Sequence, residues 1–254
     1  MEYLRAEHVR LRMSLAVQLV DGFTDRAVAS SVVVRIDNAP APIRKPDGYY
    51  VFLNAEGPEA TLRILSQQYE EHVETVCLSS LDPLEPVVKI RLQPNRHYPF
   101  PRGTTCVEGK AAPGGRILIW CPEMTGYLRL MEDYKKEEQE IRLFHPAQSD
   151  LEGKSFRITE TAGEKGEIFT IRKLSDAGEE RYLLDGALQN PYGKMTARIY
   201  PVLALKADET GRFFAPLPFL EREHAKTRFW LPEQKKEVEK DLIFGSMNPV
   251  DLDG

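Results

Sequence analysis

The sequence contains no long apolar stretch and no excess of basic residues. A membrane-spanning helix needs roughly 18 or more consecutive apolar residues, and no stretch of the 254 residues approaches that length. Charged residues interrupt the first 20 residues, so the sequence lacks the apolar region of a signal peptide. The 34 basic and 39 acidic residues give a net charge of -5, whereas nucleic-acid-binding proteins usually carry a basic excess. We therefore expect a cytoplasmic protein that neither inserts into a membrane nor binds nucleic acid.

Cysteine is also scarce. The three cysteines are Cys77, Cys106 and Cys121, an odd number with no CxxC pair. Because a protein that is not exported keeps its thiols reduced, we expect all three to be small buried apolar side chains rather than nucleophiles. A disulfide between Cys106 and Cys121 would require a secretion route.

Catalytic and metal-binding motifs are missing as well. The five histidines show no HxxE, HExxH or HxH spacing, and there is no GxSxG sequence. The glycines of residues 103–115 lack the order of a phosphate-binding loop and favour a turn-rich hairpin. Glu221, Glu223 and His224 are the densest group of possible ligands, but a strand would place His224 on the opposite face, which favours a solvated loop. The sequence thus predicts a protein that is not an enzyme and has no metal or cofactor.

What is present is a strand pattern. Residues 9–20 alternate between apolar and polar types, which indicates a strand with one face on a core. Residues 128–141 fit a strand followed by a charged hairpin tip, and the chain from Asn248 lacks a core-facing pattern and is expected to fray. Further short strands are expected at 31–37, 49–54, 59–66, 72–78, 87–93, 116–122, 139–145, 154–159, 166–174, 180–185, 197–206, 212–217 and 227–231. This spacing is typical of β-sandwiches.

The clearest break in the pattern is the segment 94–104, which has three prolines and a glycine. Tyr98 and Phe100 stand between the prolines, so we expect a stiff connector with buried aromatic side chains rather than a flexible linker or a ligand site. We expect these two rings to wedge between two domains and to hold their relative angle. The expected organisation is a sandwich over 1–93, the connector 94–104, a β-rich domain over 105–247 and a tail over 248–254.

Two segments of the chain look alike. Residues 46–64 and 208–231 each contain an acidic residue, a glycine turn, an aromatic-rich strand, a short proline-containing loop and another strand. Gly48 and Gly211 are expected to adopt positive φ at the two turns. The likeness suggests an internal duplication.

The first part of the chain resembles carboxypeptidase-regulatory-like (transthyretin-like) β-sandwich proteins. The residues that carry the resemblance are Leu15, Val17, Leu19, Asp21, Thr24, Arg26, Val28, Val32, Val34, Lys45, Pro46, Asp47, Gly48, Tyr49, Phe52 and Tyr69. The run after them, Leu92, Pro94, Tyr98, Pro99, Phe100, Pro101, Gly103, Thr104 and Thr105, is similar to sequences encoded with phage-tail-like contractile injection systems. The resemblance implies an all-β fold of two β-sandwich (transthyretin/Ig-like) units in tandem, the second enlarged by insertions. It also implies a structural accessory or baseplate-type protein, with other subunits as partners and an extracellular place only as part of a released particle.

A carbohydrate- or surface-binding module is the alternative function, with a glycan as partner. Its candidate residues are the aromatic side chains of Trp120, Tyr127, Phe229 and Trp230. Alternation places Trp120 with Leu118 on a core face, whereas Trp230 is expected to face outward and Phe229 inward. A tryptophan in a core or an interface is favoured over a sugar platform. The charged runs 132–140 and 233–241 are expected to be solvated surface or rims that face a partner.

Overall fold

Strands make up nearly all of the regular structure. The computed structural model describes residues 12–37, 39–124, 128–145, 150–160, 166–175, 180–218 and 224–253. Across these ranges the only helical elements are two 3-10 turns, Leu78–Ser80 and Pro232–Gln234, and no helix there is long and apolar enough to cross a membrane. The predicted all-β fold class is therefore confirmed. The chain divides into two units, Met1–Pro99 and Phe100–Gly254, which are described separately.

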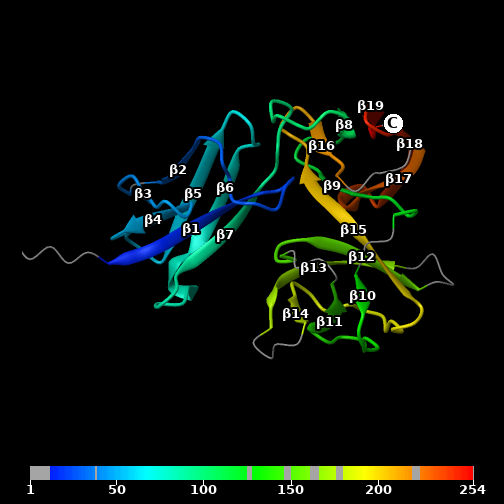
Figure 1. Ribbon diagram of the computed structural model, residues 1–254, viewed down its shortest axis with the longest axis horizontal. Coiled ribbons are helices and arrows are strands. Elements are labelled where there is room, and N and C mark those ends of the chain that lie inside the picture. Colours follow the sequence, from blue (N-terminus) through cyan, green and yellow to red (C-terminus); the bar gives the residue numbers. More distant parts are fainter. Residues whose placement is uncertain are drawn as a thin grey trace, which may run out of the picture. The chain divides into compact units, whose positions relative to one another are not determined.

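The first unit consists of two packed sheets (Figure 1). A four-stranded sheet has the order β3-β4-β1-β7, and a three-stranded sheet has the order β2-β5-β6. The strands are β1 (Met13–Asp21), β2 (Val32–Ile36), β3 (Ile43–Arg44), β4 (Tyr49–Leu53), β5 (Glu59–Ser66), β6 (His72–Cys77) and β7 (Val87–Leu92). Alternate residues of both sheets, such as Leu15 and Val17 of β1 and Leu62 and Ile64 of β5, meet in one core.

The second unit contains a three-stranded sheet, β16-β8-β19, and a nine-stranded sheet, β10-β11-β14-β13-β12-β15-β9-β17-β18. Its strands are β8 (Cys106–Lys110), β9 (Arg116–Trp120), β10 (Arg129–Leu130), β11 (Glu140–Phe144), β12 (Ser155–Glu160), β13 (Gly166–Leu174), β14 (Arg181–Leu184), β15 (Ala197–Lys206), β16 (Arg212–Pro216), β17 (His224–Leu231), β18 (Lys236–Ile243) and β19 (Met247–Asp251). Ile119 of β9, Phe213 of β16 and Phe229 of β17 belong to one core between the two sheets.

The two units share one strand plan. In the first unit, β1 pairs antiparallel with β4 and parallel with β7. In the second unit, β8 pairs antiparallel with β16 and parallel with β19. The remaining strands β2-β5-β6 and β9-β17-β18 also follow the same order, with every pairing antiparallel. The similar sequence segments 46–64 and 208–231 supply the corresponding strands β4–β5 and β16–β17.

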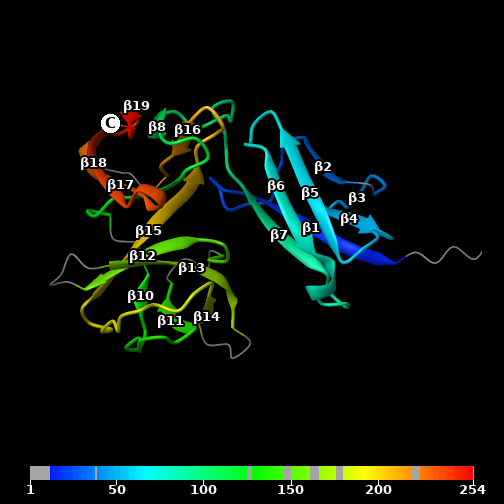
Figure 2. The ribbon, with the colours of Figure 1, turned by 180° about the vertical axis from the view of Figure 1, so that it is seen from behind.

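An insertion of six strands, β10–β15, separates β9 from β16 in the second unit. The strands curl around a core of their own that includes Leu143, Ile158 and Phe169. The inserted part of the sheet folds back on itself, because β10 lies in contact with β15. An isolated antiparallel β-bridge between Tyr134 and Tyr192 supports the same contact. Residues of β15 pair with β12 in its first part and with β9 in its last part, so one long strand belongs to both the insertion and the sandwich (Figure 2).

Three strands of the second unit, β8, β18 and β19, differ from the sequence expectations. Residues 106–110, expected in a turn-rich hairpin, form β8 at the centre of a sheet. Gly109 is required there by close packing, because a Cβ atom would lie 1.8 Å from the carbonyl oxygen of Val250 on β19. The charged run 233–241 supplies most of β18, a sheet edge at which charges are common.

The expectation of a frayed tail from Asn248 is wrong. Residues 247–251 form β19, and Val250 and Leu252 are buried. The side-chain amide of Asn248 donates hydrogen bonds to the carbonyl oxygens of Cys106 and Ile243. A polar side chain thus fixes the final strand, which is why a pattern search for apolar residues misses it. The strand and hairpin expected at 128–141 are confirmed, because β10 pairs antiparallel with β11.

Candidate functional site

A pocket of about 510 Å³ lies on one face of the nine-stranded sheet. Arg157 of β12 and Glu237 of β18 both line it, although three strands separate β12 from β18 in the sheet. The sheet must therefore curve around the pocket, as strongly twisted sheets do. We call this pocket, with Arg116, Ser155, Arg157, Gly166, Trp230 and Glu237 in its wall, the β12–β18 groove.

Both tryptophans lie on the face of the sheet that forms this groove. Trp120 is directly opposite Arg228, and Trp230 is directly opposite Leu118, so all four residues share one face. Trp120 is buried, as expected, and Phe229 is buried on the other face in the sandwich core. Trp230 is only partly buried and lines the groove, which agrees with its expected outward direction. Tyr127 lies outside the described residues.

Arg157 is held in place over a ring. Its guanidinium carbon lies 4.7 Å from the ring centroid of Trp120, which is cation–π geometry. Gly166 leaves room for it, because a Cβ atom at that position would lie 3.2 Å from the same carbon. Burial lowers the pKa of Arg157, while the nearby Glu237 carboxylate raises it. An arginine side chain stays protonated through such shifts, so the groove contains a positioned positive charge.

The acidic side of the groove is neutralised by Arg228. Its Nη1 atom donates to Glu237 Oε1 at 2.9 Å. Its Nε atom lies 3.3 Å from Glu239 Oε2, an ion pair without hydrogen-bond alignment. Lys226 Nζ lies 3.5 Å from the other oxygen of Glu239. The groove therefore combines a partly exposed indole, two arginines, and a carboxylate whose charge is already shared with a cation.

The two connector aromatics are bound to different units. The hydroxyl of Tyr98 donates to Asp21 Oδ2 at 2.6 Å, and its ring packs against Phe23 and Tyr69 in the first unit. The ring of Phe100 lies 5.7 Å from that of Phe214 on β16 in the second unit. Each end of the connector is thus attached to its own sandwich.

Asp21 is the centre of the first of these attachments. It is 5% exposed, and four hydrogen bonds reach its carboxylate. Tyr69 and Tyr98 donate to Oδ2 from their hydroxyls, while the backbone N–H groups of Phe23 and Thr24 donate to Oδ1. Burial, helped by the hydrogen bond to Asp21, raises the pKa of Tyr98 to about 12. The same causes raise the pKa of Tyr69. The carboxylate of Asp21 therefore joins the turn after β1 to Tyr69 and to the connector.

The predicted glycine turns are present. Gly48 has φ +89° and Gly211 has φ +78°, a region that other residues adopt at a cost. At Gly211 a Cβ atom would also lie 2.4 Å from the carbonyl oxygen of Ala111. Both glycines therefore shape the turns before β4 and β16 and lie outside the β12–β18 groove.

The cysteines and histidines form no common site in the part of the chain that the structure describes. Cys106 and Cys121 are buried, as expected, and burial raises the pKa of the Cys106 thiol to about 11. The expected burial of Cys77 is wrong: it is exposed, because on the edge strand β6 its neighbour Val76 faces the core instead. Hydrogen bonds with Ser79 and Ser80 lower the pKa of the Cys77 thiol. Within the described ranges no three His, Cys, Asp or Glu residues are placed to hold a metal ion, and Glu221 and Glu223 lie outside these ranges.

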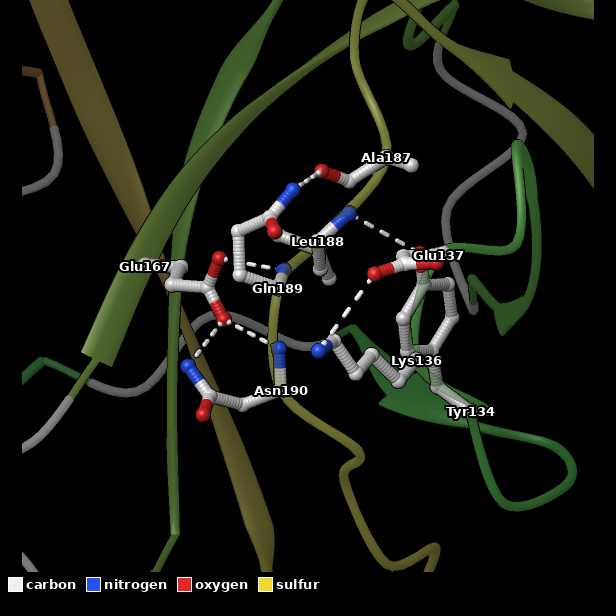
Figure 3. Close-up of polar contacts among 8 residues, drawn as sticks. All are labelled: Tyr134, Lys136, Glu137, Glu167, Ala187, Leu188, Gln189 and Asn190. Carbon is white, nitrogen blue, oxygen red and sulfur yellow. Dashed lines mark hydrogen bonds and ion pairs between the residues drawn. The ribbon is translucent and has the colours of Figure 1, made fainter.

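A second polar cluster, in the insertion, was not predicted from the sequence. The carboxylate of Glu167 on β13 accepts hydrogen bonds from the backbone N–H groups of Gln189 and Asn190 and from the Asn190 amide (Figure 3). The hydroxyl of Tyr192 donates to it at 2.9 Å. Burial alone would raise the pKa of Glu167, but these hydrogen bonds outweigh it and lower that pKa. The cluster fixes the segment that leads from β14 to β15.

The comparisons with known proteins identify no relative. No family model matches the chain, and no match is found among curated proteins or solved structures.

Proposed function

We propose that this chain is a non-enzymatic structural protein, an accessory or baseplate-type component of a phage-tail-like contractile injection particle. The observation that carries the proposal is the repeated sandwich plan joined by a short connector. That connector is attached to the first unit through Tyr98 and to the second through Phe100. Such an arrangement suits a part that holds neighbouring subunits in place. The resemblance of the first unit and the connector to proteins of these particles points to the same function.

Sheet edges and exposed apolar side chains supply surfaces for such neighbours. β6 and β7 each end a sheet in the first unit, and an edge strand can pair with a strand of another chain. Val33, Leu65 and Val73 are 45%, 40% and 49% exposed. Val33 is directly opposite Leu65 on adjacent strands, so these two form an apolar strip on the outer face of the β2-β5-β6 sheet.

Affinity purification of the tagged chain from its native cell, with mass spectrometry of the bound proteins, tests this function. We expect sheath, tube or baseplate subunits to be recovered with it. A triple variant in which Val33, Leu65 and Val73 are replaced by serine should recover fewer of them, because it removes the apolar strip and the exposed Val73 side chain on β6. Recovery of the chain alone, free of any particle subunit, would refute the proposal.

A second candidate function is binding to a surface glycan. The partly exposed indole of Trp230 in the β12–β18 groove favours it, because aromatic rings stack on the apolar faces of sugars while polar groups nearby bind the hydroxyls. Retention of the full chain on immobilised cell-surface polysaccharide, and loss of that retention in Trp230→Ala, is the expected result. Equal retention of both proteins would exclude this use of the groove.

A further inference from the structure

We propose that the β12–β18 groove binds an acidic sugar, namely a carboxylate-bearing unit of a polysaccharide. This inference rests on the second candidate function and gives its ligand class. Ligand sites occupy roughly 300–1,000 Å³, and the groove, at about 510 Å³, is large enough for a short saccharide segment.

Trp230 provides the apolar platform. It lies between Leu118 on β9 and Glu237 on β18, directly opposite each of them. These neighbours fix the indole at its sides while part of the ring remains accessible in the groove. A ring that is already held loses little conformational entropy when a ligand stacks on it.

Arg157 and Arg116 provide the charge selection. The guanidinium of Arg157 is fixed between the Trp120 ring and the backbone at Gly166. Arg116 is exposed at the groove wall, and Lys206 is directly opposite it on β15. A planar guanidinium binds a carboxylate through two parallel hydrogen bonds. The cations of this wall therefore favour a sugar that carries a carboxylate over a neutral one.

The remaining polar groups suit hydroxyls. Ser155 Oγ and Thr170 Oγ1 lie 2.8 Å apart in the wall and can donate to or accept from a sugar hydroxyl. Glu237 accepts from Arg228 and has further acceptor capacity. A continuous polyphosphate chain fits less well, because Glu237 and Glu239 line one side of the sheet face and would repel closely spaced phosphates.

The test is a titration of the full-length protein with trigalacturonate, with the neutral trisaccharide maltotriose as the comparison ligand. Isothermal calorimetry and tryptophan fluorescence are the readouts. We expect trigalacturonate to bind and to shift the fluorescence, and its affinity to fall as salt is raised. We expect maltotriose to bind at least about tenfold more weakly, which corresponds to about 1.4 kcal/mol.

Four variants locate the binding. Trp230→Ala and Arg116→Gln should each weaken trigalacturonate binding about tenfold or more. Phe244→Ala and Arg129→Gln replace an exposed aromatic and an exposed arginine of the same unit outside the groove and should bind as the wild type does. Circular dichroism melting checks that each variant is folded. Arg116→Gln removes an exposed side chain, so it keeps the test valid if Trp230→Ala fails to fold.

Three results would overturn the inference: no binding of trigalacturonate, equal binding of maltotriose, or equal losses in the groove and control variants. None of these results bears on the recovery of particle subunits with the tagged chain. A failed titration with successful recovery therefore rejects the sugar site and leaves the structural function in place.

Discussion

At the residue scale, a few polar side chains fix the places where apolar patterning gives no information. Asp21 ends β1, and its carboxylate joins the start of the following turn to Tyr69 and to the connector residue Tyr98. Glu167 performs the same task for the segment before β15. The sequence predicts Tyr98 as a buried connector aromatic, but it does not reveal its hydrogen-bond partner, which is 77 residues away.

Replacing Asp21 with alanine should destabilise the first unit by about 3 kcal/mol, because buried donors lose a charged acceptor. Tyr98→Phe removes one donor only and should cost about 1 kcal/mol. Trp120 and Trp230 both belong to the second unit, so tryptophan fluorescence reports that unit alone while circular dichroism reports both. In urea unfolding of both variants, we expect circular dichroism to show the first unit unfolding at a lower urea concentration than in the wild type. The transition followed by tryptophan fluorescence, which reports the second unit, should be unchanged. An unchanged circular dichroism transition in Asp21→Ala would contradict this account.

The Glu167 cluster should make the insertion sensitive to acid. Because the pKa of Glu167 is lowered in the folded protein, its stabilisation is fully present above the ordinary carboxyl pKa of about 4.3. It is lost as the pH falls through the lowered value. We expect Glu167→Gln to be less stable than the wild type at pH 7 and the gap to narrow below about pH 4. Thermal melting at several pH values checks this prediction. A difference in stability between Glu167→Gln and the wild type that does not change with pH would show that the ionised form of Glu167 is not what stabilises the insertion.

The cysteines show that residue type alone does not predict whether a side chain is buried. All three have the same apolar character in sequence, yet Cys106 and Cys121 are buried while Cys77 is exposed. The difference follows from the register of β6, where Val76 faces the core. A one-residue change of register exchanges the two faces of a strand, and the sequence around Cys77 leaves that register open.

At the element scale, strands with regular alternation are predictable and strands fixed by neighbours are not. β13 (Gly166–Leu174) and β15 (Ala197–Lys206) have the bounds expected from the sequence. β8, β18 and β19 escape prediction because glycine, charge and asparagine replace the apolar alternation. Their places depend on pairing with distant strands, for example β8 with β19. The groove escapes prediction for the same reason, since its wall combines residues of β9, β12, β13, β17 and β18.

Gly109→Ala tests the packing of β8 against β19. The added Cβ atom would overlap the Val250 carbonyl oxygen, so the strands must separate, and we expect a loss of about 3 kcal/mol or more in the stability of the second unit. Gly186→Ala is the matched control, because no atom beyond the glycine and its two chain neighbours lies within 4 Å of its Cβ position. Urea unfolding followed by tryptophan fluorescence measures both. Equal stability of the two variants would show that β19 does not pack closely on Gly109.

At the scale of the whole molecule, the same six-strand plan occurs in both units, and the second unit has gained the strands β10–β15 between β9 and β16. Only the glycine-turn segments reveal this plan in the sequence. The rest of the second unit is obscured by the insertion, which separates the corresponding strands along the chain. The sheet orders therefore support a duplication more strongly than the sequence does.

Replacing both Tyr98 and Phe100 with alanine should loosen the pair of units. Tyr98 attaches the connector to the first unit and Phe100 attaches it to the second, so their loss lengthens the part of the chain that is free to move. Small-angle scattering should show a broader range of distances between the units. Circular dichroism should retain the strand signal. A rigid scattering envelope identical to that of the wild type would contradict the role of these two rings.

The most direct test of the structural function is sedimentation of the untagged chain in a lysate of its native cell. If the chain is part of a contractile injection particle, it should sediment rapidly with tube and sheath subunits, and negative-stain microscopy of that fraction should show particles. A chain of 28.9 kDa that remains entirely in the slow fraction, while such particles sediment without it, would contradict the account.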